Sequence, residues 1–334
     1  MIARSMHPTQ SIDWRESMRA ALSDPRELLA ALGLDPDDAR VAALGSKDFS
    51  LRVPREFVAR MRHGDWNDPL LRQVLPLVDE QLSAPGYRFD AVGDHAALRT
   101  DGLLHKYAHR VLLLTTAACA VHCRYCFRRH FPYAESLAGK DNWAAPVAWL
   151  KAHPSVNEVI LSGGDPLSLS TAKLRALTDQ LASIPHLKRL RIHTRWPVVL
   201  PARVDRELLD WLENIRLERV VVIHANHANE FDADVAQALS LMRSSGATLL
   251  NQAVLLRGVN DSVSALKDLS ETLIANQVLP YYLHLLDRVQ GSAHFEVSEA
   301  DAQHLVQALK AELPGFLVPR LARETEGEPS KTFA

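Results

Sequence analysis

Short runs of β-branched and other apolar residues alternate with stretches of helical periodicity from about residue 110 onward, and this alternation strongly limits the folds open to the chain. The strand candidates are residues 111–116, 156–162, 187–194, 219–225, 247–256 and 278–285. Helix candidates between them include residues 171–183, 204–215 and 231–246, the last ending at Gly246, a residue typical of helix C-termini. Repeated strand–helix units predict a parallel sheet with helical crossovers.

Each strand candidate carries a polar cluster at or near its end. In chain order these clusters are CAVHCRYC, SGGDP, HTR, HANH, NQ and HLLD. In α/β barrels the reactive side chains of several strands gather at the C-terminal mouth, whereas an open doubly wound sheet concentrates its ligand residues at one switch point. We therefore expect an α/β fold built on a partial (β/α)6 barrel of the TIM type.

The first hundred residues have a different texture. Apolar residues recur at helical spacing in residues 14–23 and 25–34, and turn residues gather around Pro85 and Gly86. We expect an N-terminal helical extension over residues 1–100, the barrel over residues 101–315 and a C-terminal segment over residues 316–334. No side chain in the helical extension is assigned a chemical role.

The overall charge gives no sign of a polyanionic partner. The formal net charge is −2, so no strong positive field would attract nucleic acid or an anionic membrane. The longest apolar run, Val111 to Val121, is too short to cross a bilayer, and the N-terminal sequence MIARSMHPTQ lacks the apolar stretch of a secretion signal. We expect a cytoplasmic protein that binds neither nucleic acid nor membrane.

All three cysteines of the chain lie in one short loop, as Cys119, Cys123 and Cys126. So tight a group would strain a disulfide and leave one thiol over, whereas reduced thiols can bind metal. His130 would complete a Cys3His set for a structural zinc ion. Alternatively, three thiolates could hold three irons of a [4Fe–4S] cluster and leave the fourth iron without a protein ligand. The spacing itself leaves both sites open.

The C-x3-C-x2-C motif, with Tyr125 before its third cysteine, resembles the cluster loop of the radical S-adenosylmethionine superfamily. The stretches HRVLLLTTAACAVHCRYCFRRHF, VILSGGDPLSLS, RIHTRWPVVLPARV, NQAVLLRGVND and PYYLHLLDRVQGSAHF together resemble the lysine 2,3-aminomutase family. Within it the chain is most similar to the short branch associated with elongation factor P. The resemblance runs from about His105 to the C-terminus and implies a radical S-adenosylmethionine type of partial barrel.

The resemblance also implies three cofactors. A [4Fe–4S] cluster would be held by Cys119, Cys123 and Cys126, with its fourth iron binding S-adenosylmethionine. Further contacts to S-adenosylmethionine are implied for Tyr125, Gly163, Gly164, Asp165, His224 and Gln252. Pyridoxal 5′-phosphate would form a Schiff base with Lys331 in the C-terminal segment. Lys106, Tyr107 and Arg110 fall where the family places groups near this cofactor.

Substrate contacts follow from the same resemblance. Arg128 matches the family arginine that binds the substrate carboxylate, a task suited to a planar bidentate donor. Asp287 matches a carboxylate that receives the ε-ammonium group of lysine. The chain departs from the family at Glu324, where a second ammonium-binding aspartate is expected; the glutamate keeps the charge and has a longer reach.

The implied activity is an isomerase that converts (S)-α-lysine into (R)-β-lysine by a radical 1,2-amino shift, supplying β-lysine for modification of elongation factor P. Its implied partners are lysine, a cellular reductant for the cluster, elongation factor P and the lysyl ligase of that factor. One alternative is a 2,3-aminomutase for another amino acid such as glutamate, against which Asp287 argues because it would repel a second carboxylate. The other is a non-catalytic Cys3His zinc protein.

Overall fold

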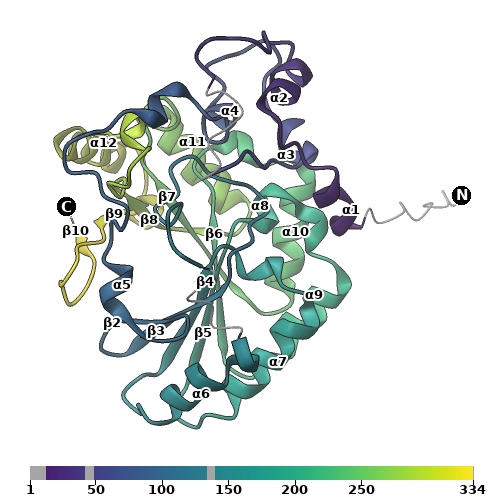
Figure 1. Ribbon diagram of the computed structural model, residues 1–334, viewed down its shortest axis with the longest axis vertical. Coiled ribbons are helices and arrows are strands. Elements are labelled where there is room, and N and C mark those ends of the chain that lie inside the picture. Colours follow the sequence, from purple (N-terminus) through teal and green to yellow (C-terminus); the bar gives the residue numbers. More distant parts are fainter. Residues whose placement is uncertain (1–12, 42–48, 134–139, 334) are drawn as a thin grey trace, which may run out of the picture.

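A computed structural model describes residues 13–41, 49–133 and 140–333 (Figure 1). The N-terminal residues on which the expectation of no secretion signal rests fall within residues 1–12, which lie outside these ranges. Within the described ranges, none of the helices combines the length and the apolar character that crossing a membrane requires.

The strands form one sheet whose spatial order follows the chain from β1 to β10. They are β1 Leu98–Thr100, β2 Leu103–Tyr107, β3 Arg110–Thr116, β4 Glu158–Gly163, β5 Arg189–Thr194, β6 Glu218–His224, β7 Thr248–Val254, β8 Leu279–His284, β9 Arg320–Arg323 and β10 Thr332–Phe333. Strands β3 to β9 pair in parallel. Among the described strands no pairing joins β1 to β10, so the sheet is an open, partial barrel, as predicted.

Helices cover the outside of this curved sheet (Figure 1). The α-helices are α1 Trp14–Arg19, α2 Pro25–Ala31, α3 Arg55–Val58, α4 Pro69–Arg72, α5 Asp94–Ala97, α6 Ala144–Lys151, α7 Thr171–Ala182, α8 Trp196–Val199, α9 Arg206–Glu213, α10 Ala233–Ser244, α11 Val263–Ala275 and α12 Glu299–Glu312. Short 3-10 turns are η1 Val78–Gln81, η2 Lys140–Trp143, η3 Pro166–Ser168, η4 Pro201–Arg203, η5 Ala228–Glu230, η6 Ala293–Phe295 and η7 Gly315–Leu317.

Local sequence explains where the crossover helices begin and end. Ser170, Asp205 and Asp232 cap the first turns of α7, α9 and α10 by accepting backbone N–H groups. Gly246 follows α10 with a φ of +85°, a left-handed conformation that glycine adopts without steric cost. The six predicted strands correspond to β3–β8, and the three helix candidates between them correspond to α7, α9 and α10.

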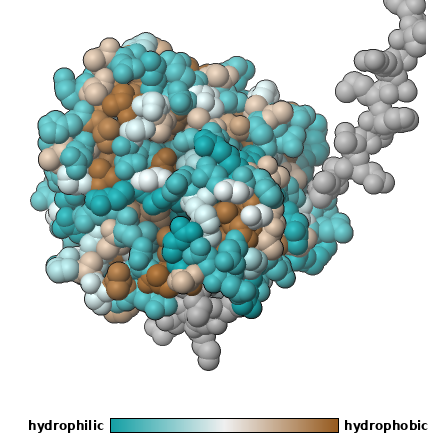
Figure 2. Space-filling model, turned by 90° about the horizontal axis from the view of Figure 1, so that it is seen from above, coloured by the Kyte–Doolittle hydropathy of each residue, from teal (hydrophilic) through white to brown (hydrophobic). Residues whose placement is uncertain are grey.

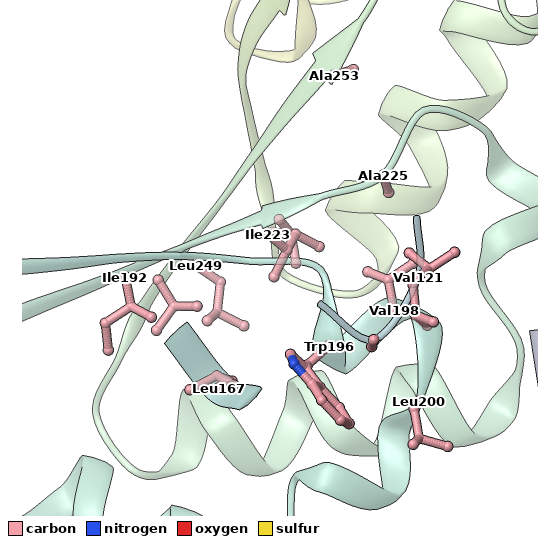
Figure 3. Close-up of a cluster of buried hydrophobic side chains, with 14 of the residues drawn as sticks. Val121, Leu167, Ile192, Trp196, Val198, Leu200, Ile223, Ala225, Leu249 and Ala253 are labelled. Carbon is pink, nitrogen blue, oxygen red and sulfur yellow. The ribbon is translucent and has the colours of Figure 1, made fainter. Parts of the chain in front are cut away.

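Alternation along the parallel strands separates the core from the cavity. In β5, Leu190 and Ile192 are buried, whereas Arg191 and His193 line the barrel cavity. Figure 3 shows the apolar side of this arrangement, where side chains from β5, β6 and β7 meet those of α8, including Trp196. The inward side chains are therefore free to carry chemistry, because the outward ones supply the packing.

Apolar residues between Trp14 and Leu75 in the described part of the chain belong to the same hydrophobic core as the barrel. Trp14 packs edge-on against Trp196 of α8, with ring centroids 5.1 Å apart. The boundary expected at residue 100 falls inside the β1–β2 hairpin, whose strands pair antiparallel. This hairpin and the terminal strands β9 and β10 were not predicted, because their alternating runs are short and only their sheet neighbours stabilise them.

The face shown in Figure 2 is mainly hydrophilic, with apolar side chains in small separate groups. Large exposed apolar side chains of the described chain include Leu82, Phe89 and Phe316. Single exposed apolar residues are normal on folded proteins and do not mark a binding face.

Candidate active site

A cavity of about 330 Å³ opens at the C-terminal ends of the parallel strands. It is lined by every residue to which the family resemblance gives a role, namely Lys106, Tyr107, Arg110, Cys119, Cys123, Tyr125, Cys126, Arg128, Gly163, Gly164, Asp165, His224, Gln252, Asp287, Glu324 and Lys331. These residues come from both ends of the sheet and from most of the strands between them. Their convergence is what a barrel mouth produces.

The three cysteines stand together on the cavity wall as free thiols. Burial, followed by the charges of the neighbouring sulfurs, raises the pKa of Cys119, and the same causes raise the pKa of Cys126 to about 11. Such sulfurs are costly as isolated thiolates, so positively charged iron would supply the compensation that they lack. The donor set therefore fits an iron–sulfur cluster.

A mononuclear zinc site fits the same residues less well. In the part of the chain that the structure describes, no three His, Cys, Asp or Glu side chains come close enough to hold a single metal ion. His130, the fourth ligand of the zinc alternative, has its Nε2 atom 3.1 Å from the carbonyl oxygen of Gln290 and packs edge-on against Phe89. An iron–sulfur cluster does not require the three sulfurs to reach the same metal ion, because each thiolate binds a different iron.

The Gly-Gly-Asp loop after β4 packs directly on the cysteine loop. The backbone N–H of Gly164 donates to the carbonyl of Thr116 at 2.7 Å, and a Cβ atom on Gly164 would lie 2.5 Å from the carbonyl oxygen of Ala118. Gly163, at φ +115°, occupies a conformation that favours glycine. Both glycines are thus required by the contact between the two loops, in addition to lining the cavity.

Asp165 ties this loop to the end of β5. Its carboxylate accepts from the hydroxyl of Thr194 at 2.7 Å and from the backbone N–H groups of Arg195 and Leu167 at 2.6 and 3.1 Å. Burial raises the pKa of Asp165 to about 6 against the effect of these donors. Both carboxylate oxygens of Asp165, which the resemblance assigns to cofactor binding, thus accept hydrogen bonds from protein donors.

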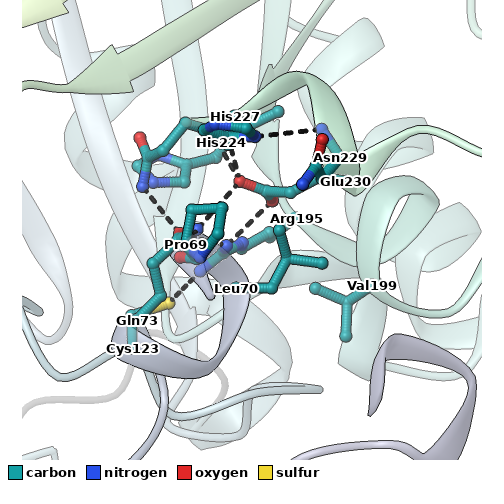
Figure 4. Close-up of polar contacts among 12 residues, drawn as sticks. Pro69, Leu70, Gln73, Cys123, Arg195, Val199, His224, His227, Asn229 and Glu230 are labelled. Carbon is teal, nitrogen blue, oxygen red and sulfur yellow. Dashed lines mark hydrogen bonds and ion pairs between the residues drawn. The ribbon is translucent and has the colours of Figure 1, made fainter. Parts of the chain in front are cut away.

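A buried polar network supports the cysteine loop from behind (Figure 4). The guanidinium of Arg195 donates to Cys123 Sγ, to the Tyr125 hydroxyl at 2.8 Å, to Gln73 Oε1 at 2.7 Å and to Glu230 Oε2 at 2.9 Å. Gln73 and Glu230 have no solvent exposure. Burial alone would raise the pKa of Glu230, but Arg195 outweighs it and the pKa is lowered.

The predicted S-adenosylmethionine contacts on β6 and β7 border this network. His224 Nε2 lies 2.8 Å from the Tyr125 hydroxyl, and burial, followed by the charge of Arg195, lowers the pKa of His224 to about 3. A neutral imidazole is therefore presented to the cavity. Gln252 lines the cavity beside it, paired in register with His224 across the two strands.

The opposite wall of the cavity is a chain of alternating charges. Lys331 Nζ lies 2.5 Å from Glu324, which also accepts from the Tyr107 hydroxyl at 2.7 Å. Lys106 Nζ lies 3.7 Å from Glu324 and 2.7 Å from Asp94, which in turn binds Arg128. Burial would raise the pKa of Glu324, but its positive neighbours, led by Lys331, lower it.

This wall fits pyridoxal phosphate. Lys331 is held on the terminal hairpin of β9 and β10 with its amine 5.8 Å from the ring centroid of Tyr282. Lys106, Arg110 and Arg191 line the same cavity and provide positive charge for a phosphate ester. Pyridoxal phosphate has two requirements: an amine of the protein that can bond to its aldehyde, and cations that balance its dianionic phosphate.

Asp287 is a carboxylate without a hydrogen-bonding partner among the described residues. Burial, only partly offset by Lys331, raises the pKa of Asp287 to about 7. The side chain lines the cavity. A desolvated carboxyl group of this kind is suited to a cationic ligand, because a ligand ammonium would restore the charge compensation that the protein itself does not provide.

Sequence reasoning missed several residues of this site. Gln73 and Asp94 lie in the helical extension, to which no chemistry was assigned, and nothing in their local sequence marks them. Arg195 did carry a signal, because it closes the HTR cluster after β5. His193 and His284 also reach the cavity from strand ends that were marked as polar.

Curated proteins named L-lysine 2,3-aminomutase from several bacteria are similar to the chain. The protein of Escherichia coli (strain K12) is 49% identical over 321 residues, covering 96% of this chain and 94% of its own. That of Haemophilus influenzae is 45% identical, with 96% and 95% covered. That of Clostridium subterminale is 32% identical, covering 96% of this chain and 77% of its own.

No protein-family model matches the chain. A solved structure of native anSMEcpe with bound AdoMet superposes on 60% of this chain and 58% of its own, with 12% sequence identity and a TM-score of 0.45. The superposition is partial, so the curated relatives alone assign the family.

Proposed function

This chain belongs to the lysine 2,3-aminomutase family, and we propose that it converts (S)-α-lysine into (R)-β-lysine. One observation carries the proposal: a single cavity is lined by three free thiols, the amine of Lys331, the guanidinium of Arg128 and the carboxyl group of Asp287. In this proposal the thiols would form the cluster site, Lys331 would bind the aldehyde, and Arg128 and Asp287 would receive the two ends of a lysine molecule.

Three cofactors are proposed, and the residues present fit each of them. The thiols would hold a [4Fe–4S] cluster, the loops around Gly163 and Gln252 would receive S-adenosylmethionine, and Lys331 would bind pyridoxal phosphate. When bound, the cluster and S-adenosylmethionine would supply hydrogen abstraction by one-electron chemistry, and pyridoxal phosphate a conjugated ring that delocalises an unpaired electron.

The task of the protein is to bind and orient lysine between these groups. Arg128 would bind the α-carboxylate through hydrogen-bond donors in a fixed plane, and Asp287 would bind the ε-ammonium group. Holding both ends of a flexible chain selects one conformation and so places one carbon for reaction.

The decisive experiment is an anaerobic assay of the reconstituted protein with lysine, dithionite, S-adenosylmethionine and pyridoxal phosphate, with β-lysine measured by mass spectrometry. We expect β-lysine from lysine and no β-amino acid from glutamate, because glutamate would place a carboxylate against Asp287. Formation of β-glutamate without β-lysine would overturn the assignment of the substrate.

Replacing Asp287 tests the same proposal at the level of one residue. Asp287→Asn removes the charge for the ε-ammonium group, so the KM for lysine should rise by about ten- to a hundredfold. Asp205→Asn, at the outer helix cap of α9, is the control and should leave the KM unchanged. An unchanged KM in Asp287→Asn would remove this residue from the substrate site.

We also propose that the β-lysine serves elongation factor P, in a cytoplasmic pathway that includes the lysyl ligase of that factor and a cellular reductant for the cluster. The support is the resemblance of the sequence to the short family branch. Mass spectrometry of elongation factor P from cells lacking this protein should show the factor without β-lysine. A fully β-lysylated factor in those cells would contradict the proposal.

A further inference from the structure

We infer that Asp94 is a positioning residue that fixes the substrate-binding edge of Arg128 and ties it to Lys106 on the cofactor side. The inference deepens the proposed function and rests on it for the identity of the two ligands. Asp94 is the first residue of the short helix α5, in the part of the chain to which the sequence assigned no chemistry. It is 1% exposed and lines the cavity.

The two oxygens of Asp94 bind two different cations. Oδ2 accepts from Arg128 Nε at 2.7 Å, and Oδ1 lies 2.7 Å from Lys106 Nζ. Burial by itself would raise the pKa of Asp94, but the charges of Arg128 and Lys106 outweigh it and the pKa is lowered. Asp94 is therefore a charged bridge between the two groups.

The contact with Asp94 determines which edge of the Arg128 guanidinium can bind a carboxylate of the substrate. With Nε bound to Asp94 and Nη1 donating to the hydroxyl of Ser162 at 3.2 Å, Nη2 has no partner among the described residues and the side chain lines the cavity. A substrate carboxylate is thus confined to the outer Nη1–Nη2 edge of the guanidinium. The edge that includes Nε is closed to it, because a second carboxylate would meet Asp94.

Asp94 also sets the spacing between Arg128 on the substrate side and Lys106 on the cofactor side. Lys106 is held from two sides, by Asp94 and by the carbonyl of Val92, to which its ammonium donates at 2.7 Å. Arg128 and Lys106 are positioned by one carboxylate on one short helix. Moving that carboxylate would therefore weaken the binding of the substrate and of the cofactor phosphate together. Replacing a residue with a purely structural role would not weaken these two binding steps in particular.

The test compares Asp94→Asn, Asp94→Glu and Asp68→Asn. Asp68 is a control of the same kind: a fully buried aspartate at the start of the short helix α4, bound to backbone N–H groups and absent from the cavity lining. In Asp94→Asn we expect the KM for lysine to rise and the affinity for pyridoxal phosphate to fall by about tenfold each, with kcat within about threefold. Asp94→Glu should recover part of both losses.

Pyridoxal phosphate alone is titrated by its visible absorbance in the cluster-free protein, so this readout does not depend on turnover. If the wild-type protein forms no β-lysine, the proposed function fails, while the absorbance titration still tests the contact with Lys106. A folded Asp94→Asn protein with unchanged KM and unchanged cofactor affinity would overturn the inference, as would equal effects in Asp68→Asn. Should Asp94→Asn not fold, a wild-type KM in Asp94→Glu would overturn it.

Discussion

The two walls of the cavity are built in opposite ways. The wall that carries the cysteine loop, here called the cysteine wall, is backed by buried side chains from distant parts of the chain. Gln73, Arg195 and Glu230 each bond to several partners, and their exposed fractions are 0%, 6% and 0%. The opposite wall, here called the tail wall, is a single row of ion pairs that runs from Lys331 to Arg128. The side chains of Lys106 and Lys331 in this row remain 22% and 23% exposed.

This difference shows which parts of the site must be rigid before the ligands arrive. The proposed cluster would need its sulfurs in place, and a multiply bonded buried network holds Cys123 through Arg195. Lys331, as the proposed Schiff-base lysine, would instead exchange partners as ligands bind, and a partly hydrated ion pair can be released at small cost. We expect the two walls to respond differently to substitution.

The largest effect should follow from the loss of one sulfur. Cys123→Ala removes a proposed cluster ligand, so iron content should fall to background and turnover should drop by on the order of a thousandfold or more. Iron analysis and the visible spectrum of anaerobic protein measure the loss. Binding of pyridoxal phosphate should persist, and its disappearance would show that the two walls are not independent.

Lys331→Ala is the converse substitution at the tail wall. Covalent capture of pyridoxal phosphate should be lost, and turnover should fall on the order of a thousandfold, because the group proposed to bond the cofactor is absent. Absorbance of the bound cofactor checks the prediction, and iron content should match the wild type. Lys267→Ala, which removes an exposed lysine, is the control and should change neither.

Glu230→Gln tests the rigidity of the cysteine wall. A neutral amide leaves Arg195 buried without its counter-ion, so the free energy of unfolding should fall by about 3–5 kcal/mol. Chemical denaturation measures this change. Glu312→Gln, which breaks an exposed pair with Lys267, is matched in chemistry and should cause no measurable loss.

A smaller effect is the pH dependence of lysine binding through Asp287. The pKa of Asp287 is raised to about 7, so the group is neutral below that pH and charged above it. An ammonium ligand needs the charged form, so the KM for lysine should rise about tenfold from pH 8 to pH 6. Asp287→Asn should abolish this dependence. A flat KM profile in the wild type would show that Asp287 does not control lysine binding.

The same raised pKa has a consequence for stability. A carboxyl group with an ordinary pKa in the unfolded chain loses its proton near pH 4, whereas Asp287 keeps its proton to about pH 7 in the folded protein. Its ionisation therefore opposes folding above pH 4, with the full penalty above pH 7. Asp287→Asn should unfold at higher temperature than the wild type at pH 8 and at a similar temperature at pH 4.

Much of the site was accessible from the sequence because parallel strands impose a simple rule. Residues that follow strands meet at one end of the barrel, so the strand pattern alone was enough to place the cysteine loop, His224 and Asp287 near one another. The helical extension offered no such rule. Gln73 follows a short helix and Asp94 begins one, and neither position is marked by periodicity.

By itself the sequence determined the order of the strands β3–β8 with the helices α7, α9 and α10 between them, the position of the thiols and the family, since periodicity, spacing and motif are local properties of the chain. Only the tertiary structure decided the partners: that Asp94 bridges Arg128 and Lys106, that Arg195 stands behind Cys123, and that Glu324 pairs with Lys331. The reason is physical. Charges interact through space, over distances that the separation of residues along the chain does not reveal.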